Sequence, residues 1–300
     1  MTVNTLSCLS RVKRTTSGKN TRPDWRSDYI IEEFIGDRSG SMKSMSSSSL
    51  KVTEEFLNGR RKLARESTSK HYSLSCTTFD DKMTLVFEKS GKRVTNKDIK
   101  DAVNEMTPRG STRLIDTIYD RVEEVIKKIQ KIKSKWSKEE RKLEPVISAC
   151  ISVLTDGADN VSFKTARELN HLINIFESVH GGTAMFLAAN QDAIVNGTYF
   201  GFKPGKCITF AANNEGCAAA IRSASAAMTR TCSGRSANFN CLERTASMPI
   251  NTSNHKTDIS GLTRTSCGVP LSLRRTYATG LITNKKGVIN IVDSDEDLDN

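Results

Sequence analysis

The chain has 300 residues, 37% hydrophobic and only 6% aromatic, which allows one sizeable domain plus extensions or two small domains. No apolar run approaches the length that crosses a bilayer, and eight scattered cysteines without a C-x-x-C pair exclude a zinc site and a disulfide framework. The formal charge of +11 and the pI near 9.3 are compatible with a nucleic acid or an anionic surface as partner.

Residues 1–27 are rich in Ser, Thr, Arg and Lys, and their first acid is Asp24. We predict a disordered basic arm, with an organelle transit peptide as the alternative, because apolar residues recur at near-helical spacing between positions 3 and 12. The arm lacks the apolar core of a secretory signal. Three cysteines fall in strand-like runs, which is typical of buried free thiols in a reducing compartment. These features predict a cytoplasmic location, with the nucleus as the alternative and secretion excluded.

The first predicted strand, 29–36, runs directly into Asp37-Arg38-Ser39-Gly40-Ser41. Alternate residues of an extended segment point the same way, so Asp37, Ser39 and Ser41 can present three oxygens to one point. One carboxylate and two hydroxyls, with no His or Cys nearby, suit a hard divalent cation such as Mg2+ or Mn2+. Three ligands do not fill an octahedral shell, so the motif predicts further oxygen donors downstream.

Strands and helices alternate through the following part of the chain. The further expected strands are 72–79, 83–88, 146–154, 183–188 and 206–210; the expected helices are 42–66, 96–105, one from 114 onward, 162–179 and 213–230, with a helical turn at 191–196. This alternation predicts a doubly wound α/β sheet. In such sheets ligands gather at the carboxyl ends of the strands.

Two downstream residues are placed to complete the metal site. Thr112 lies in Gly110-Ser111-Thr112 at the start of a helix, and Asp156 follows the apolar run 146–154 directly. Both are expected at the sheet edge that Asp37 reaches. The alternative is that the carboxylates only cap helices or turns and that the serines are ordinary loop residues.

Asp37, Ser39, Ser41, Thr112 and Asp156 resemble, in type and order, the metal-ion-dependent adhesion site (MIDAS) of von Willebrand factor type A domains. The resemblance covers about 28–230 and implies a mostly parallel sheet with one antiparallel edge strand. It implies Mg2+ or Mn2+ as the cofactor, with the three hydroxyls as direct or near-direct ligands and the two carboxylates acting directly or through water. It also implies a partner protein that supplies a Glu or Asp carboxylate.

The first strand departs from the family pattern. A parallel strand that is covered on both faces should be nearly all apolar. Here Glu32 and Glu33 lie inside it, and Gly36 immediately precedes Asp37. We therefore expect this strand to be weakly stabilised.

We predict a binding module and not an enzyme, because there is no Gly-rich phosphate loop, no general base beside the ligands, and the four His are dispersed. The alternative function is a basic nucleic-acid-associated scaffold in which the metal site is not essential, since the Ku DNA-repair proteins resemble this fold. The strongly basic stretch 127–142 would then be an anion-binding face; otherwise it is a solvated helix end.

Residues 231–300 lack sustained periodicity, and we predict a largely disordered tail. Near its end, Val288, Ile289, Ile291 and Val292 precede a run of acids and a serine. This pattern resembles a SUMO-interaction motif, which could add a strand to the sheet edge of a SUMO-like partner. The alternative is an incidental acidic tail.

Overall fold

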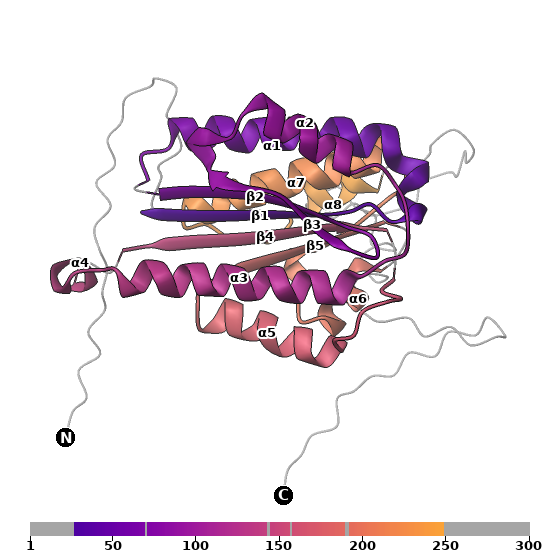
Figure 1. The fold of residues 1–300 in the computed structure, drawn as a ribbon. Coiled ribbons are helices and arrows are strands. Elements are labelled where there is room, and N and C mark those ends of the chain that lie inside the picture. The colour runs from indigo at the N-terminus through magenta and orange to yellow at the C-terminus, as the bar shows by residue number, and fades with distance from the viewer. Residues whose placement is uncertain (1–26, 70, 143–144, 157, 190–191, 249–300) are drawn as a thin grey trace, which may run out of the picture.

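The structure is a computed structural model that describes residues 27–69, 71–142, 145–156, 158–189 and 192–248. Its centre is a six-stranded sheet in the order β3-β2-β1-β4-β5-β6, in which only β3 is antiparallel to its neighbour (Figure 1). The strands are β1 (Tyr29–Asp37), β2 (His71–Phe79), β3 (Met83–Ser90), β4 (Ile147–Thr155), β5 (Thr183–Ala189) and β6 (Cys207–Phe210). The predicted doubly wound sheet with one antiparallel edge strand is confirmed.

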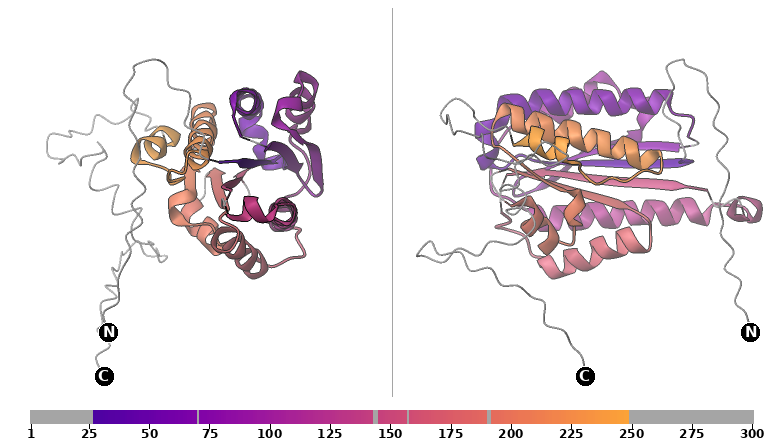
Figure 2. Two further views of the ribbon diagram at one scale, coloured as in Figure 1. Left: turned by 90° about the vertical axis from the view of Figure 1, so that its left-hand side faces the viewer. Right: turned by 180° about the vertical axis from the view of Figure 1, so that it is seen from behind.

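Helices cover both faces of the sheet and leave its edges to β3 and β6 (Figures 1 and 2). One face carries α1 (Ser46–Glu66), α2 (Asn96–Glu105), α7 (Asn214–Cys232) and α8 (Cys241–Ser247); the other carries α3 (Leu114–Ser134), α5 (Ala166–Ser178) and α6 (Ala193–Tyr199). The short α4 (Lys138–Lys142) lies beyond the end of α3. Each face has its own apolar core, so the sheet is buried between two helical layers.

Local capping fixes where several helices begin. Thr95 caps α2 in a capping box with Asp98. Thr165 caps α5 in the same way, so this helix begins later than the predicted residue 162. The side chain of Ser162 instead accepts a hydrogen bond from the backbone of α3, which ties the loop before α5 to the start of α3.

The two glutamates inside β1 are buried in ion pairs. Consecutive strand residues point to opposite faces, so Glu32 and Glu33 enter different helical layers. Glu32 pairs with Arg60 of α1, and both side chains are 0% exposed. Glu33 pairs with Arg121 of α3, with 2.8 Å between Arg121 Nη2 and Glu33 Oε2. The expectation of a weakly stabilised strand is corrected in part: both charges are compensated by arginines that sequence reasoning did not connect to them.

Gly36 has a packing reason. A Cβ built at this position would lie 2.5 Å from Met106 Sδ and 3.1 Å from the Phe34 ring. The glycine therefore lets the residues after α2 pack closely on β1 immediately before Asp37.

The structured part continues beyond residue 230, where the tail was predicted to begin. α7 ends at Cys232, and α8 follows after a short loop. Arg230 pairs with Glu243 of α8 at 2.7 Å, and Ser247 Oγ donates to Thr209 O of β6 at 2.9 Å. Residues 231–248 are therefore part of the packed structure. The predicted arm up to residue 26 and the tail from 249, including residues 288–292, lie outside the described residues.

No helix among the described residues is both long and apolar enough to cross a membrane.

Candidate metal centre

The motif after β1 is folded into a tight network around Asp37. The Asp37 carboxylate is fully buried and accepts a hydrogen bond from Ser39 N at 2.7 Å. Its second oxygen accepts from Thr155 Oγ1 at 2.6 Å. The hydroxyls of Ser39 and Ser41 lie 3.0 Å apart. The structure thus brings Asp37, Ser39 and Ser41 together, but Ser41 lies in a 3-10 helix (η1, Gly40–Met45) and not in the predicted extended segment.

Asp156 joins this network from the neighbouring strand. β1 and β4 pair in parallel with Gly36 opposite Leu154, so the two strands reach the same edge of the sheet. Ser41 Oγ donates to Asp156 Oδ1 at 2.7 Å. Four of the five predicted residues are therefore joined in one hydrogen-bonded network.

Thr112 is held beside this set through its backbone. Its N–H donates to Asn160 Oδ1 at 2.9 Å, and its carbonyl accepts from Asn160 N at 3.0 Å. Two residues earlier, Gly110 O accepts from Gly40 N at 3.2 Å. The Thr112 loop is thus fixed to both the β1 motif and the loop after β4. Within the described residues, no hydrogen bond joins the Thr112 side chain to the other four.

The electrostatics of the site favour a cation. Burial raises the pKa of Asp37 to about 6, although hydrogen bonds from Thr155 and Ser39 lower it in part. Burial also raises the pKa of Asp156. Among the described residues, no Lys, Arg or His forms an ion pair with either carboxylate. Ser41 is exposed, so the oxygens can be reached from solvent.

This donor set fits a hard divalent cation. It offers two carboxylates and hydroxyl oxygens, and it has neither sulfur nor imidazole. In the described part of the chain, no group of three or more His, Cys, Asp or Glu is placed to hold a metal. A metal at this edge therefore depends on the serine and threonine hydroxyls.

Arg38 lies inside the motif but turns away from the metal ligands. Its guanidinium is buried and pairs with Asp80 at 2.9 Å, and it also donates to Thr78 Oγ1 at 3.1 Å. Burial raises the pKa of Asp80, but hydrogen bonds from Lys82 N–H, Arg109 and Arg38 outweigh that effect and lower it to about 2. Arg38 therefore fastens the motif to the β2–β3 hairpin and leaves Asp37 without a cation.

The loop after Asp156 is pinned to the first turn of α3. Ile115 N donates to Asp159 Oδ1 at 3.1 Å. In return, Asp116 accepts from the backbone N–H of Phe163 at 3.1 Å and of Lys164 at 2.8 Å. Sequence reasoning missed these residues. An acid in the first turn of a helix was the available signal, because it suits the helix amino terminus.

Phe163 projects from this pinned loop. Its side chain is 87% exposed, and the Arg113 guanidinium lies 5.2 Å from its ring centroid. An exposed aromatic ring on a fixed loop, at the same sheet edge as Asp156, is an available contact for a partner.

Comparisons with known proteins find a distant structural similarity. No family model matches the chain, and no curated protein matches it. Among solved structures, proximal thread matrix protein 1 from the mussel byssus, with a zinc-occupied MIDAS motif, is 16% identical over 71% of this chain and 46% of its own, with a TM-score of 0.44. A von Willebrand factor type A structure from Catenulispora acidiphila is 14% identical over 68% of this chain and 43% of its own, with a TM-score of 0.42. The pilus adhesin SpaC from Lactobacillus rhamnosus GG is 11% identical over 71% of this chain and 30% of its own, with a TM-score of 0.48. The chain thus spans less than half the length of each.

The predicted cytoplasmic location, with secretion excluded, is contradicted by this comparison. The similar structures come from a byssus thread and from a pilus. The inference from free thiols was not valid. The cysteines in β2, β4 and β6 are buried and free, and burial raises the pKa of the Cys150 thiol to about 11. Buried thiols of this kind are unreactive in any compartment, so they do not report on redox conditions.

Proposed function

We propose that this chain, whose fold is that of von Willebrand factor type A domains, binds a partner protein through a divalent cation at the edge of its sheet. Asp37, Ser39, Ser41 and Asp156 would hold the cation, and Thr112 would complete the set from the loop before α3. The observation that carries the proposal is the pair of carboxylates, linked through Ser39 and Ser41, that no described cation neutralises.

The charge balance defines the partner. Two carboxylates offset a 2+ ion, and the hydroxyls add oxygens without negative charge. A bound Mg2+ or Mn2+ would supply an open coordination position with affinity for one more anionic oxygen. A Glu or Asp side chain of the partner protein would provide that oxygen, and the exposed position of Ser41 leaves room for it.

The chain's own residues prepare the site before the partner arrives. The backbone N–H of Ser39 and the hydroxyl of Thr155 orient the Asp37 carboxylate. Arg38 and Asp80 fix the motif to the hairpin. The Asn160 contacts hold Thr112 in place. Such preorganisation lowers the cost of binding.

Phe163 would add affinity and selectivity beside the cation. Exposed aromatic residues on rigid segments are frequent hot spots of protein interfaces. We therefore expect the partner to carry an apolar residue close to its acidic one. In this proposal the domain binds and does not catalyse. The SUMO-like partner of the tail stays a prediction, since its residues lie outside the described structure.

A peptide array tests the proposal directly. Peptides would differ only in having Glu or Gln, or Asp or Asn, at the central position, and the full-length protein would be applied with Mn2+ or with EDTA. We expect binding to acidic peptides with Mn2+ only, and its loss in Asp37→Ala. Asp81→Ala is the matched control, because Asp81 is an exposed acid in the β2–β3 turn. Equal binding of Glu and Gln peptides, or binding that survives EDTA, would contradict the proposal.

A further inference from the structure

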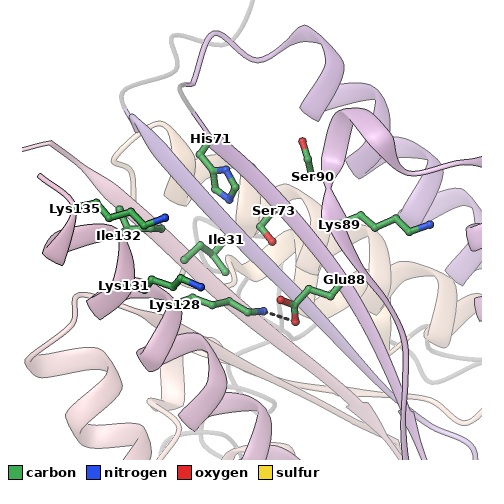
Figure 3. A pocket seen from close by; sticks show the side chains of 10 residues that line it. All are labelled: Ile31, His71, Ser73, Glu88, Lys89, Ser90, Lys128, Lys131, Ile132 and Lys135. Carbon is green, nitrogen blue, oxygen red and sulfur yellow. Dashed lines mark ion pairs between the residues drawn. The ribbon is translucent and has the colours of Figure 1, made fainter.

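A pocket lies between α3 and the β2–β3 edge, at the end of the sheet opposite the candidate metal centre (Figure 3). Its volume is about 320 Å3. His71 at its rim is the first residue of β2 and pairs with Tyr29, whereas Asp37 pairs with Phe79 at the far end of the same strand. The pocket and the candidate metal centre are therefore separated by nearly the whole strand, roughly 25 Å.

The lining of this pocket is strongly basic. It contains four lysines and a single glutamate. Lys128 and Lys131 lie in α3, and Lys135 is its C-cap residue; their i, i+3 and i+7 spacing places them on one face of the helix. The sequence showed a basic stretch here, but only the structure shows that part of it faces a pocket.

The single glutamate cannot neutralise the lysines. Glu88 pairs with Lys128 at 2.7 Å and with Arg121 at 3.2 Å. Burial raises the pKa of Glu88, but Lys128 and Arg121 outweigh that effect and lower it. Lys89 pairs with Asp98 at 2.7 Å. Among the described residues, Lys131 and Lys135 have no acidic partner.

The base of the pocket offers neutral donors and apolar walls. Ile31 and Ile132 line it together with Ser73 and His71, whose side chains form no hydrogen bond with other described residues. Burial and the charge of Lys128 lower the pKa of His71, which is the effect expected of a positive local field. The site thus combines two unpaired ammonium groups with a hydroxyl and an imidazole.

We propose that this pocket binds a small oligophosphate, a molecule that carries a diphosphate or two neighbouring phosphates. Lys131 and Lys135 lie one helical turn apart and have no acidic partner among the described residues. They suit a ligand with two phosphate groups better than a ligand with a single negative charge. A concave site of this size favours a compact anion over a polymer that lies across a surface. On the outer side of α3, Lys127 is already paired with Glu123 and Glu124, so the helix offers no continuous basic track there.

Calorimetric titration with inorganic pyrophosphate tests the proposal. The full-length protein would be used in excess EDTA and also as Asp37→Ala, so that binding through a metal at the other site cannot contribute. We expect binding at moderate ionic strength in both proteins. Replacing Lys131 and Lys135 together by Gln should weaken it roughly tenfold, because each removed charge loses a near-surface ion pair.

Lys133→Gln is the matched control. Lys133 is exposed on the same helix but does not line this pocket. It should change the pyrophosphate affinity by less than about twofold. A local readout comes from the histidines. Addition of pyrophosphate should shift the ring resonances of His71 and leave those of His171 and His180 unchanged, because of these three only His71 lines the pocket.

Three results would overturn the proposal: no pyrophosphate binding, equal loss in Lys133→Gln and in the double variant, or unchanged His71 resonances. A single-stranded DNA oligonucleotide serves as the competing probe. If it bound more tightly than pyrophosphate and depended equally on Lys131 and Lys133, the basic end of α3 would be a nucleic-acid surface and not an oligophosphate pocket. None of these outcomes depends on the proposed metal site.

Discussion

The buried acids in the middle of β1 have ion-pair partners, whereas the buried acid at its carboxyl end has none among the described residues. Glu32 and Glu33, in the middle, each meet an arginine from the helix that covers their face of the sheet. Asp37, at the end of the same strand, is equally buried but receives only hydrogen bonds from neutral groups. In the middle of β1, each buried carboxylate is thus paired with a guanidinium. Asp37 has no such partner, and we therefore expect a cation from solution to bind there.

The comparison also explains the position of Arg38. This arginine is adjacent to Asp37 in sequence and fully able to carry a positive charge, yet it pairs with Asp80 across the hairpin. If it had paired with Asp37, the strand end would resemble its middle and only the Asp156 carboxylate would remain uncompensated. Arg38 instead joins the motif to the β2–β3 hairpin, and the Asp37 carboxylate stays available for a cation.

Arg60→Met is expected to have the largest effect on stability. It leaves Glu32 buried without its ion-pair partner, which should lower the free energy of unfolding by about 3–5 kcal/mol. Urea unfolding measures the loss. The double variant Glu32→Gln with Arg60→Met is the control, and we expect it to recover much of the lost stability because no buried charge remains. A single-variant loss below about 1 kcal/mol would contradict the structural role of this pair.

Asp37 should make the free energy of unfolding of the metal-free protein fall as the pH rises through about 6. Its folded pKa of about 6 lies above the ordinary aspartate value of 3.8, so the folded state binds the proton more tightly. The stabilising contribution is complete below about pH 4 and is lost as the pH rises through about 6, by roughly 3 kcal/mol at most. The difference in unfolding free energy between wild type and Asp37→Asn, measured in EDTA from pH 4 to 8, isolates this contribution. A difference that does not vary with pH would show that Asp37 is not held in the environment described here.

Asp37→Asn at neutral pH should not lower the stability of the metal-free protein, in contrast to Arg60→Met. Removing an unpaired buried charge should leave the metal-free protein as stable as wild type or more stable by about 1 kcal/mol, while Mn2+ binding is lost. Chemical unfolding with EDTA and with Mn2+ separates the two effects. Wild type should gain stability from Mn2+, and the variant should not. A loss of more than about 2 kcal/mol in EDTA would mean that Asp37 has a structural role.

Phe163→Ala should have the smallest effect on stability. The side chain is 87% exposed, so the free energy of unfolding should change by less than about 0.5 kcal/mol. Mn2+ affinity should also be unchanged, because the ring supplies no oxygen. Binding to the acidic peptides selected on the array should weaken by roughly tenfold if the ring is an interface hot spot. Unchanged peptide binding would remove Phe163 from the proposed interface.

The sequence predicted the candidate site better than it predicted the structure that supports it. Asp37, Ser39 and Ser41 are local in sequence, and Asp156 follows a continuous apolar strand, so both carboxylates could be placed at one sheet edge. The predicted alternation does not extend to Ser41, because Gly40–Met45 form a 3-10 helix and not an extended segment. Arg60 and Arg121 could not be assigned to Glu32 and Glu33, because those contacts depend on how α1 and α3 cross the sheet. The helix α8 was missed because its surroundings read as tail. Its capping box, Asn240 with Glu243, was the signal that could have revealed it.

The most direct test of the central claim is calorimetric titration of Mn2+ and Mg2+ into the full-length protein, with Asp37→Ala and Thr112→Ala beside wild type. Asp81→Ala serves again as the control acid. We predict saturable binding to wild type and to Asp81→Ala, no binding to Asp37→Ala, and weakened binding to Thr112→Ala. Absence of binding to folded wild type, or binding that survives Asp37→Ala, would contradict the assignment of the uncompensated carboxylates as a metal site.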